Sequence, residues 1–171
     1  GVNAKAEVTG GSVTNVIQVA RRESDLGIAM ADVVSSAYAG TGRFPEPLPL
    51  RVLFTAYPNI VHMLSLRDSG IKTIDDLAGK RVALGAQGSG TSVAAINIIT
   101  GSGLSLDDIA PRYLSFGETT TGLKDGTLDA GFVVGGLGIA AVTEFSVTRD
   151  IEIIALSDAE IARLTQQFPA Y

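Results

Sequence analysis

The sequence has 171 residues, of which 46% are hydrophobic and 18% are charged, and its formal net charge is −5 at pH 7. This composition is typical of a packed globular chain, with room for one large domain or two small ones. The chain has no cysteine and a single histidine. Thiolate sites, disulfides and a histidine-rich metal site are therefore excluded, and we expect no metal and no cofactor. Without a Lys/Arg cluster, we also expect no nucleic-acid partner and no anionic membrane face.

No stretch approaches the roughly 18 consecutive apolar residues of a membrane span, and residues 1–7 lack the pattern of a signal peptide. An export signal, if the gene encodes one, is therefore expected to have been removed. The absence of cysteine is compatible with a periplasmic protein, although many cytosolic proteins share it.

In the first 69 residues the patterns predict one helix and several strands. Gly10 and Gly11 end the first strand, and Ser12 begins a helix whose apolar positions follow helical spacing. A loop rich in glycine and proline, residues 40–49, leads to the last two strands. The strands are predicted at residues 4–9, 26–30, 51–56 and 60–66.

From residue 70 onward strands and helices alternate, which is typical of an α/β fold with parallel-rich sheets flanked by helices. Capping-box spacing, Thr73 with Asp76 and Ser105 with Asp108, marks two short helical turns, and Pro111 is expected to close the second. The helices are predicted at residues 92–100 and 117–126, followed by a polar terminal helix. The strands are predicted at residues 81–85, 112–116, 129–134 and 151–156.

The loop Gly85-Ala-Gln-Gly-Ser-Gly-Thr91 joins a strand to a helix and is the strongest candidate for a binding site. Its unpaired backbone N–H groups and the positive end of the helix attract an anion, and Ser89 and Thr91 add hydroxyl groups. A phosphate P-loop is disfavoured because Thr91 stands in place of the lysine, and the dinucleotide fingerprint lacks its third glycine. A carboxylate fits best; the alternative is a simple N-terminal cap.

The segment Gly10-Gly11-Ser12 repeats this arrangement, with Asn15 one turn into its helix; the alternative is again a serine cap. Tyr57 is positioned to stack on a ligand or hydrogen-bond it, and the alternative is a packed loop tyrosine. His62 is interpreted as a core histidine. Ser89 lacks a flanking glycine elbow and His62 would have to act alone as a base, so no catalytic constellation is found and no enzyme is expected.

An internal repeat favours two lobes of similar construction. The helix after Gly11 leads to Asp25-Leu-Gly-Ile28, and the helix after Gly117 leads to Asp129-Ala-Gly-Phe132. Asp-x-Gly is also a common turn sequence, so the repeat alone does not decide between the two interpretations. Two such lobes would hold a small solute between them, beyond the carboxyl ends of the strands.

Several motifs together resemble the TAXI-type solute-binding proteins of TRAP transporters (periplasmic immunogenic-protein-like). The motifs are Thr9-Gly-Gly-Ser-Val-Thr-Asn15, Tyr57-Pro-Asn-Ile-Val-His62, Val82-Ala-Leu-Gly-Ala-Gln-Gly-Ser-Gly-Thr91, Leu123-Lys-Asp-Gly-Thr-Leu-Asp-Ala-Gly-Phe-Val-Val134 and Pro169-Ala-Tyr171. This resemblance spans nearly the whole chain. It implies a bilobal type II periplasmic-binding-protein fold, a periplasmic location, and delivery of a small carboxylated solute, such as glutamate, to the membrane subunits of a TRAP transporter. By position, the resemblance implies a cleft lined by Ser12, Asn15, Tyr57, Ser89, Gly90 and Thr91, with Phe132, Val133 and Gly135 on the far wall.

The same resemblance implies a division of the chain into part of lobe 1 (1–69), lobe 2 (70–157) and the start of a return crossover to lobe 1 (158–171). Family members begin with a glycine- and tyrosine-rich strand-loop-helix and return to the first lobe after the Pro-x-Tyr region. The present sequence contains neither segment. We therefore expect uncovered apolar surface around residues 26–30 and 51–66, and weak binding or aggregation of this stretch.

The expected full-length protein is a monomer that closes its two lobes around the solute in the manner of a Venus flytrap. Two alternatives stay open at this stage. One is an enzyme on the same scaffold that binds a phosphorylated substrate at the loop 85–91, and the other is a cytosolic effector-sensing domain.

Overall fold

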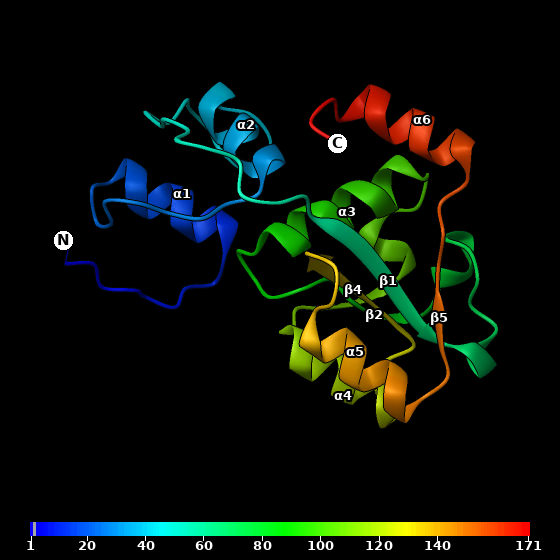
Figure 1. Ribbon diagram of the computed structural model, residues 1–171. Helices are drawn as coiled ribbons and strands as arrows, with labels where there is room; N and C mark the ends of the chain where they lie inside the picture. Colours follow the sequence, from blue (N-terminus) through cyan, green and yellow to red (C-terminus); the bar gives the residue numbers. More distant parts are fainter. Residues whose placement is uncertain (2) are drawn as a thin grey trace.

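The structure is a computed structural model that describes residue 1 and residues 3–171 (Figure 1). Its helices are α1 (Ser12–Ala20), α2 (Ala31–Ala39), α3 (Gly90–Gly101), α4 (Phe116–Lys124), α5 (Ala140–Thr148) and α6 (Asp158–Gln167). Its strands are β1 (Ile60–Leu66), β2 (Arg81–Ala83), β3 (Ala110–Arg112), β4 (Ala130–Gly135) and β5 (Ile151–Ile153). Short 3-10 turns cover Arg67–Ser69, Asp75–Leu77 and Leu106–Asp108. The predicted α/β class is confirmed.

The strands form one five-stranded sheet in the order β3-β2-β4-β1-β5. β2 pairs in parallel with both β3 and β4, as the alternation of strands and helices predicts. β1 pairs antiparallel with β4, with His62 opposite Val133, and antiparallel with β5. The sheet is therefore parallel on one side of β4 and antiparallel on the other.

Helices cover both faces of this sheet, because side chains along each buried strand point alternately to opposite faces. Met63 and Phe132 belong to the core cluster that also contains residues of α3 and α6. Their strand neighbours Leu64 and Val133 belong to the other cluster, with residues of α4 and α5. The arrangement is a three-layer α/β/α body, with the sheet between the two helix pairs (Figure 1).

α1 and α2 lie beside this body and have a small core of their own (Figure 1). That core contains Val16 of α1, Val33 and Ala37 of α2, and Phe44 and Leu50 of the following loop. The segment 51–59 leads from this α1/α2 unit into β1 in an irregular conformation.

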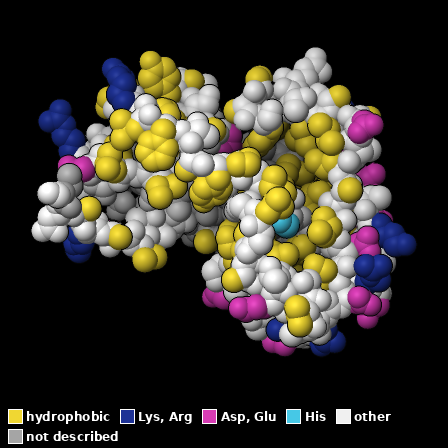
Figure 2. Space-filling model, viewed as in Figure 1, with side chains coloured by type: hydrophobic (Ala, Val, Ile, Leu, Met, Phe, Trp, Pro, Cys, Tyr) yellow, Lys and Arg dark blue, Asp and Glu magenta, His cyan; other side chains and the backbone are white. Residues whose placement is uncertain are grey.

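Three predicted strands, at residues 4–9, 26–30 and 51–56, are not strands in the structure. A strand needs a neighbour for its backbone hydrogen bonds, and the sheet takes none of these segments. Their apolar side chains stay in solvent: the exposed fractions are 72% for Leu26, 81% for Ile28 and 78% for Phe54. The expectation of uncovered apolar surface is thus confirmed for residues 26–30 and 51–59, but it is wrong within residues 60–66, where Met63 and Leu64 are buried in the sheet. Figure 2 shows hydrophobic side chains gathered on the visible face of both parts of the molecule.

Further elements differ from the sequence-based prediction. The strand predicted at 112–116 lies at Ala110–Arg112, and Pro111 is part of it instead of closing a turn. Proline is tolerated there because β3 is an edge strand. The helices α2 and α5 were not predicted.

The division into lobes at residue 69 stays a prediction. β1, which precedes that boundary, pairs with β4 and β5, so the sheet takes a strand from the first predicted segment. α6 packs against α3 through Leu164, which belongs to the same core cluster as Ile98.

Candidate functional site

The glycine loop between β2 and α3 places unpaired backbone N–H groups at the start of a helix. Gly85 has a positive φ of +85°, and a Cβ there would lie 2.7 Å from Cβ of Thr91, so the loop turns back tightly on itself. Ser89 is the N-terminal cap of α3, and its Oγ accepts a hydrogen bond of 3.0 Å from the N–H of Ser92. Within the described chain the N–H groups of Gly90 and Thr91 have no acceptor. These amides give α3 a positive N-terminal end.

The second glycine loop packs directly against the first. The N–H of Val13, in the first turn of α1, donates a 3.1 Å hydrogen bond to the carbonyl of Gly88. Gly11 has φ +118°, and a Cβ at this position would lie 2.9 Å from Cα of Ser89. The N-terminal ends of α1 and α3 are therefore in contact through their loops, as the two predicted anion sites require if they belong to one cleft.

Ser12 and Met30 occupy the space next to the start of α3. The Oγ of the buried Ser12 accepts a 3.1 Å hydrogen bond from the N–H of Met30. A side chain at Gly90 would overlap the Met30 sulfur and would lie 2.7 Å from the Ser12 Oγ. A larger residue at this position would have to displace the side chains of Met30 and Ser12. The predicted residues Ser12, Ser89, Gly90 and Thr91 are thus brought together, with Met30 as an unpredicted neighbour.

Asn15 holds the segments on either side of α1. Its Oδ1 accepts a hydrogen bond from the Thr9 hydroxyl, and its Nδ2 donates a 2.7 Å hydrogen bond to the carbonyl of Ile28. Both ends of the Asn15 amide are therefore engaged within the chain. The predicted contact of Asn15 with a ligand stays a prediction. Thr14 was not predicted, although its hydroxyl lies between Gly10 and Gly88. A threonine in the first turn of a helix, as Thr14 is, carries no sequence signal of its own.

A second group of predicted residues lies at the end of β4. Tyr57 is 58% exposed, and its ring lies against Gly136, where a Cβ would come within 3.6 Å of the Tyr57 Cδ2. Gly135 ends β4 and is half-buried. Because β2 and β4 are parallel, Gly135 and the loop after β2 lie at the same edge of the sheet.

Phe132 and Val133 are buried in the two core clusters, with exposed fractions of 1% and 0%. Their side chains pack against helices instead of facing solvent. Their predicted place on the cleft wall stays a prediction, and in this arrangement only their backbone is near the carboxyl edge.

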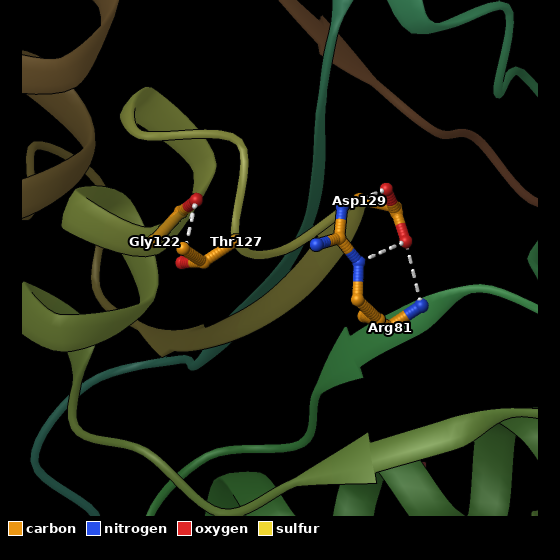
Figure 3. Close-up of polar contacts among 4 residues, drawn as sticks. All are labelled: Arg81, Gly122, Thr127 and Asp129. Carbon is orange, nitrogen blue, oxygen red and sulfur yellow. Dashed lines mark hydrogen bonds and ion pairs between the residues drawn. The ribbon is translucent and has the colours of Figure 1, made fainter.

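At the other end of these strands, where β2 and β4 begin, an ion pair fixes β2 against β4 (Figure 3). Arg81 donates to Asp129 from its backbone N–H (2.8 Å), from Nε (2.9 Å) and from Nη2 (2.7 Å). The side-chain hydrogen bond from Arg81 lowers the pKa of Asp129 below its usual value. On the neighbouring turn, the Thr127 hydroxyl donates to the carbonyl of Gly122 (Figure 3). This end of the strands is structural and lies away from the glycine loops.

The predicted internal repeat has a structural counterpart. In each Asp-x-Gly sequence the glycine packs against the preceding helix: a Cβ at Gly27 would lie 3.2 Å from Val19 of α1, and one at Gly131 would overlap Thr119 of α4. The two aspartates differ, because Asp129 forms the ion pair described above whereas Asp25 is exposed. The repeat therefore reflects helix packing.

The electrostatic character of the loops comes from backbone groups, because no lysine or arginine is among the residues that form the contact. His62 is buried, and its Nδ1 lies 3.3 Å from the carbonyl of Val133, which agrees with a core histidine. Residue 1 and residues 3–171 contain no group of three or more potential metal-ligating side chains. Within the same part of the chain, no helix is long and apolar enough to cross a membrane.

Comparison with solved structures finds partial matches to substrate-binding proteins. The aliphatic sulphonate binding protein SsuA from Escherichia coli is 23% identical, with a TM-score of 0.48 over 55% of this chain and 31% of that chain. SsuA from Xanthomonas axonopodis pv. citri, bound to MOPS, is 26% identical, with a TM-score of 0.47 over 56% and 31%. A histidine-bound ABC uptake transporter substrate-binding protein from Streptococcus pneumoniae is 18% identical, with a TM-score of 0.45 over 66% and 50%.

The matched region thus spans 31% of the length of the first two sulfonate-binding proteins. A protein-family model, by contrast, matches the present sequence in full, over residues 1–171. The family that it describes is the NMT1-like family. On this match, the chain belongs to the NMT1-like family.

Proposed function

We propose that this chain is part of an extracytoplasmic solute-binding protein, of the TAXI type that serves TRAP transporters. Its solute is a small carboxylate, such as glutamate or a related amino or organic acid. The carboxylate group binds between the two glycine loops, at the N-terminal ends of α1 and α3. The protein works without catalysis, and its partners are the solute and the membrane subunits of the transporter.

One observation carries this proposal: the N-terminal ends of two helices are in contact through their loops. Each helix N-terminus is equivalent to about half a positive charge, so two in contact repel unless negative charge lies between them. In the structure the carbonyl of Gly88 compensates α1 in part, through Val13. The N–H groups of Gly90 and Thr91 have no acceptor among the described residues, and a carboxylate offers them two oxygen atoms.

The loops favour a carboxylate over a larger anion because the available charge is small. Neither loop contributes a lysine or arginine, so two half-charges and a few hydrogen bonds must hold the anion. Hydrogen bonds to a charged group are worth about 1.5–3 kcal/mol each. Three of them, with helix-end terms of up to about 2 kcal/mol, reach the roughly 8 kcal/mol of micromolar binding.

Solute entry requires the two loops to separate, because they are in van der Waals contact. Gly11 lies against Ser89, and Met30 lies against Gly90. The segment 51–59 joins the α1/α2 unit to β1, and Tyr57 rests on Gly136 at its end. A hinge movement at this segment would open the loops and admit the solute.

The proposal is tested by paired cap variants in the full-length protein. Ser89→Ala and Ser157→Ala each remove a serine cap, from α3 and from α6 respectively, and each should cost about 0.5–2 kcal/mol of stability. Only Ser89→Ala should also weaken glutamate binding, by about tenfold, in calorimetric titration. The Ser157 variant controls for general destabilisation, since α6 begins far from the loops in the sequence and contributes nothing to them.

A thermal-shift screen with amino acids, dicarboxylates and nucleotides defines the solute class, because a ligand that binds the folded state raises the melting temperature. Stabilisation by one carboxylate, lost in Thr91→Ala, is the expected result. Stabilisation by nucleotides alone would overturn the proposal and favour a phosphate-binding enzyme.

A further inference from the structure

A separate cavity of about 350 Å³ lies between α2, α3 and the segment that follows α6. In Figure 2 the molecular surface is hollowed between α2 and this C-terminal segment. Its lining includes Asp32, Ser36, Thr41, Asn97, Phe168 and Tyr171. None of the residues assigned to the carboxylate site is among them.

The cavity contains one buried carboxylate. Asp32 is only 7% exposed. Its Oδ2 accepts a 2.9 Å hydrogen bond from the hydroxyl of Tyr171, which in turn accepts a 3.0 Å hydrogen bond from Nδ2 of Asn97. Burial, together with the negative charge of Asp32, raises the pKa of Tyr171, so this hydroxyl keeps its proton and acts as a donor to the carboxylate.

The negative charge of Asp32 has no cationic partner in the described structure. The ion pairs there are Lys5 with Glu7 and Arg81 with Asp129, and the lining contains no lysine, arginine or histidine. The start of α2 offers a partial positive charge, worth about 0.3–1 kcal/mol to a nearby acid. A nine-tenths-buried carboxylate with one hydrogen bond and a helix end retains unused acceptor capacity at Oδ1.

Three hydroxyl groups of the lining are also free to accept hydrogen bonds. The hydroxyl groups of Ser35, Ser36 and Thr41 form no hydrogen bonds with other described residues. An ammonium group has three donors and no acceptor, which complements a carboxylate oxygen and neighbouring hydroxyls. The rings of Phe168 and Tyr171, in an edge-to-face arrangement with centroids 6.0 Å apart, provide an apolar wall for a short carbon chain.

From this geometry we infer that the cavity at Asp32 is a second binding site, which takes a small organic ammonium ion such as a primary alkylamine. A divalent metal ion is a poor match, because it needs several charged or carbonyl oxygen ligands and the cavity contributes a single carboxylate. The cavity shares no residue with the carboxylate site and takes a ligand of the opposite charge.

The probe is n-butylamine, compared with n-butanol, which keeps the carbon chain and removes the charge. Binding to the full chain is measured by calorimetry and by melting temperature. The amine is expected to bind and to stabilise the fold, whereas the alcohol is not. Equal effects of butylamine and butanol, or no effect of either, overturn the inference.

Asp32→Asn keeps the size of the side chain and an acceptor for Tyr171, and should weaken amine binding at least tenfold. Asp25→Asn, an exposed acid outside the cavity, is the matched control and should leave amine binding unchanged. If Asp32→Asn does not fold, the double variant Ser36→Ala/Thr41→Val should weaken amine binding at least threefold. Amine binding that survives every folded variant overturns the inference. All of these measurements are made without glutamate, so a failure of amine binding is distinguishable from a failure of glutamate binding at the glycine loops.

Discussion

Replacing Gly11 by alanine should force the two glycine loops apart and destabilise the protein by about 2–6 kcal/mol. Gly11 has φ 118° and ψ −154°, a region that is almost restricted to glycine and costs other residues about 1–3 kcal/mol. An alanine Cβ would also lie 2.9 Å from Cα of Ser89, a backbone atom that cannot rotate away. Overpacking of this kind costs about 1–3 kcal/mol more.

Urea denaturation followed by circular dichroism measures this change as a lower midpoint at constant slope. Gly42→Ala is the matched control, because Gly42 also has a positive φ, +61°, and nothing lies within 4 Å of its would-be Cβ. The control should lose only the backbone contribution, about 1–2 kcal/mol. Equal losses in both variants would mean that the loops do not press on one another, and would refute the geometry of the candidate site.

Three further results are expected. Asp129→Asn should make the free energy of unfolding depend less on pH in the acid range. The hydrogen bond from Arg81 lowers the pKa of Asp129. The ionised carboxylate therefore stabilises the fold above the ordinary pKa of about 3.9, and this stabilisation is lost as the pH falls through the lowered pKa of the folded protein. Melting temperatures across this range, with exposed Asp125→Asn as the control, measure the effect. Leu164→Ala should cost about 2–5 kcal/mol in urea denaturation, because this buried side chain fixes α6 on α3; a loss below about 1 kcal/mol would contradict that packing. Phe54→Ser should reduce light scattering by the concentrated protein, because this exposed ring favours association, and unchanged scattering would assign association to another surface.

Local rules predicted the elements whose ends carry their own chemistry. The capping box at Ser105 and Asp108 is present in the structure, and Asp76 accepts hydrogen bonds from both the N–H and the hydroxyl of Thr73. The glycine loop before α3 could be predicted because it combines a strand, a left-handed turn at Gly85 and a serine cap. These signals depend only on residues that are close together in the sequence, so local patterns are enough to predict them.

Elements that depend on distant packing were missed or wrongly assigned. α2 and α5 are rich in valine, threonine and serine, which have weak helix propensity. They form because Val33 and Phe145 become buried. The segment 51–56 has the composition of a strand, but no neighbouring strand pairs with it. In the candidate site, the sequence identified Ser12, Ser89 and Gly90, whereas Met30 reaches Gly90 from a segment sixty residues earlier and could not be found by local pattern.

The antiparallel insertion of β1 has a consequence for how the chain folds as it is made. His62 lies opposite the carbonyl of Val133, 71 residues later in the sequence. At ribosomal rates of about 5–20 residues per second, β1 waits on the order of 4–14 s for its partner. During that time an apolar central strand has no neighbour to pair with, which makes folding slow and exposes the nascent chain to aggregation. The proper formation of this sheet therefore depends on how well the strand is shielded before β4 emerges.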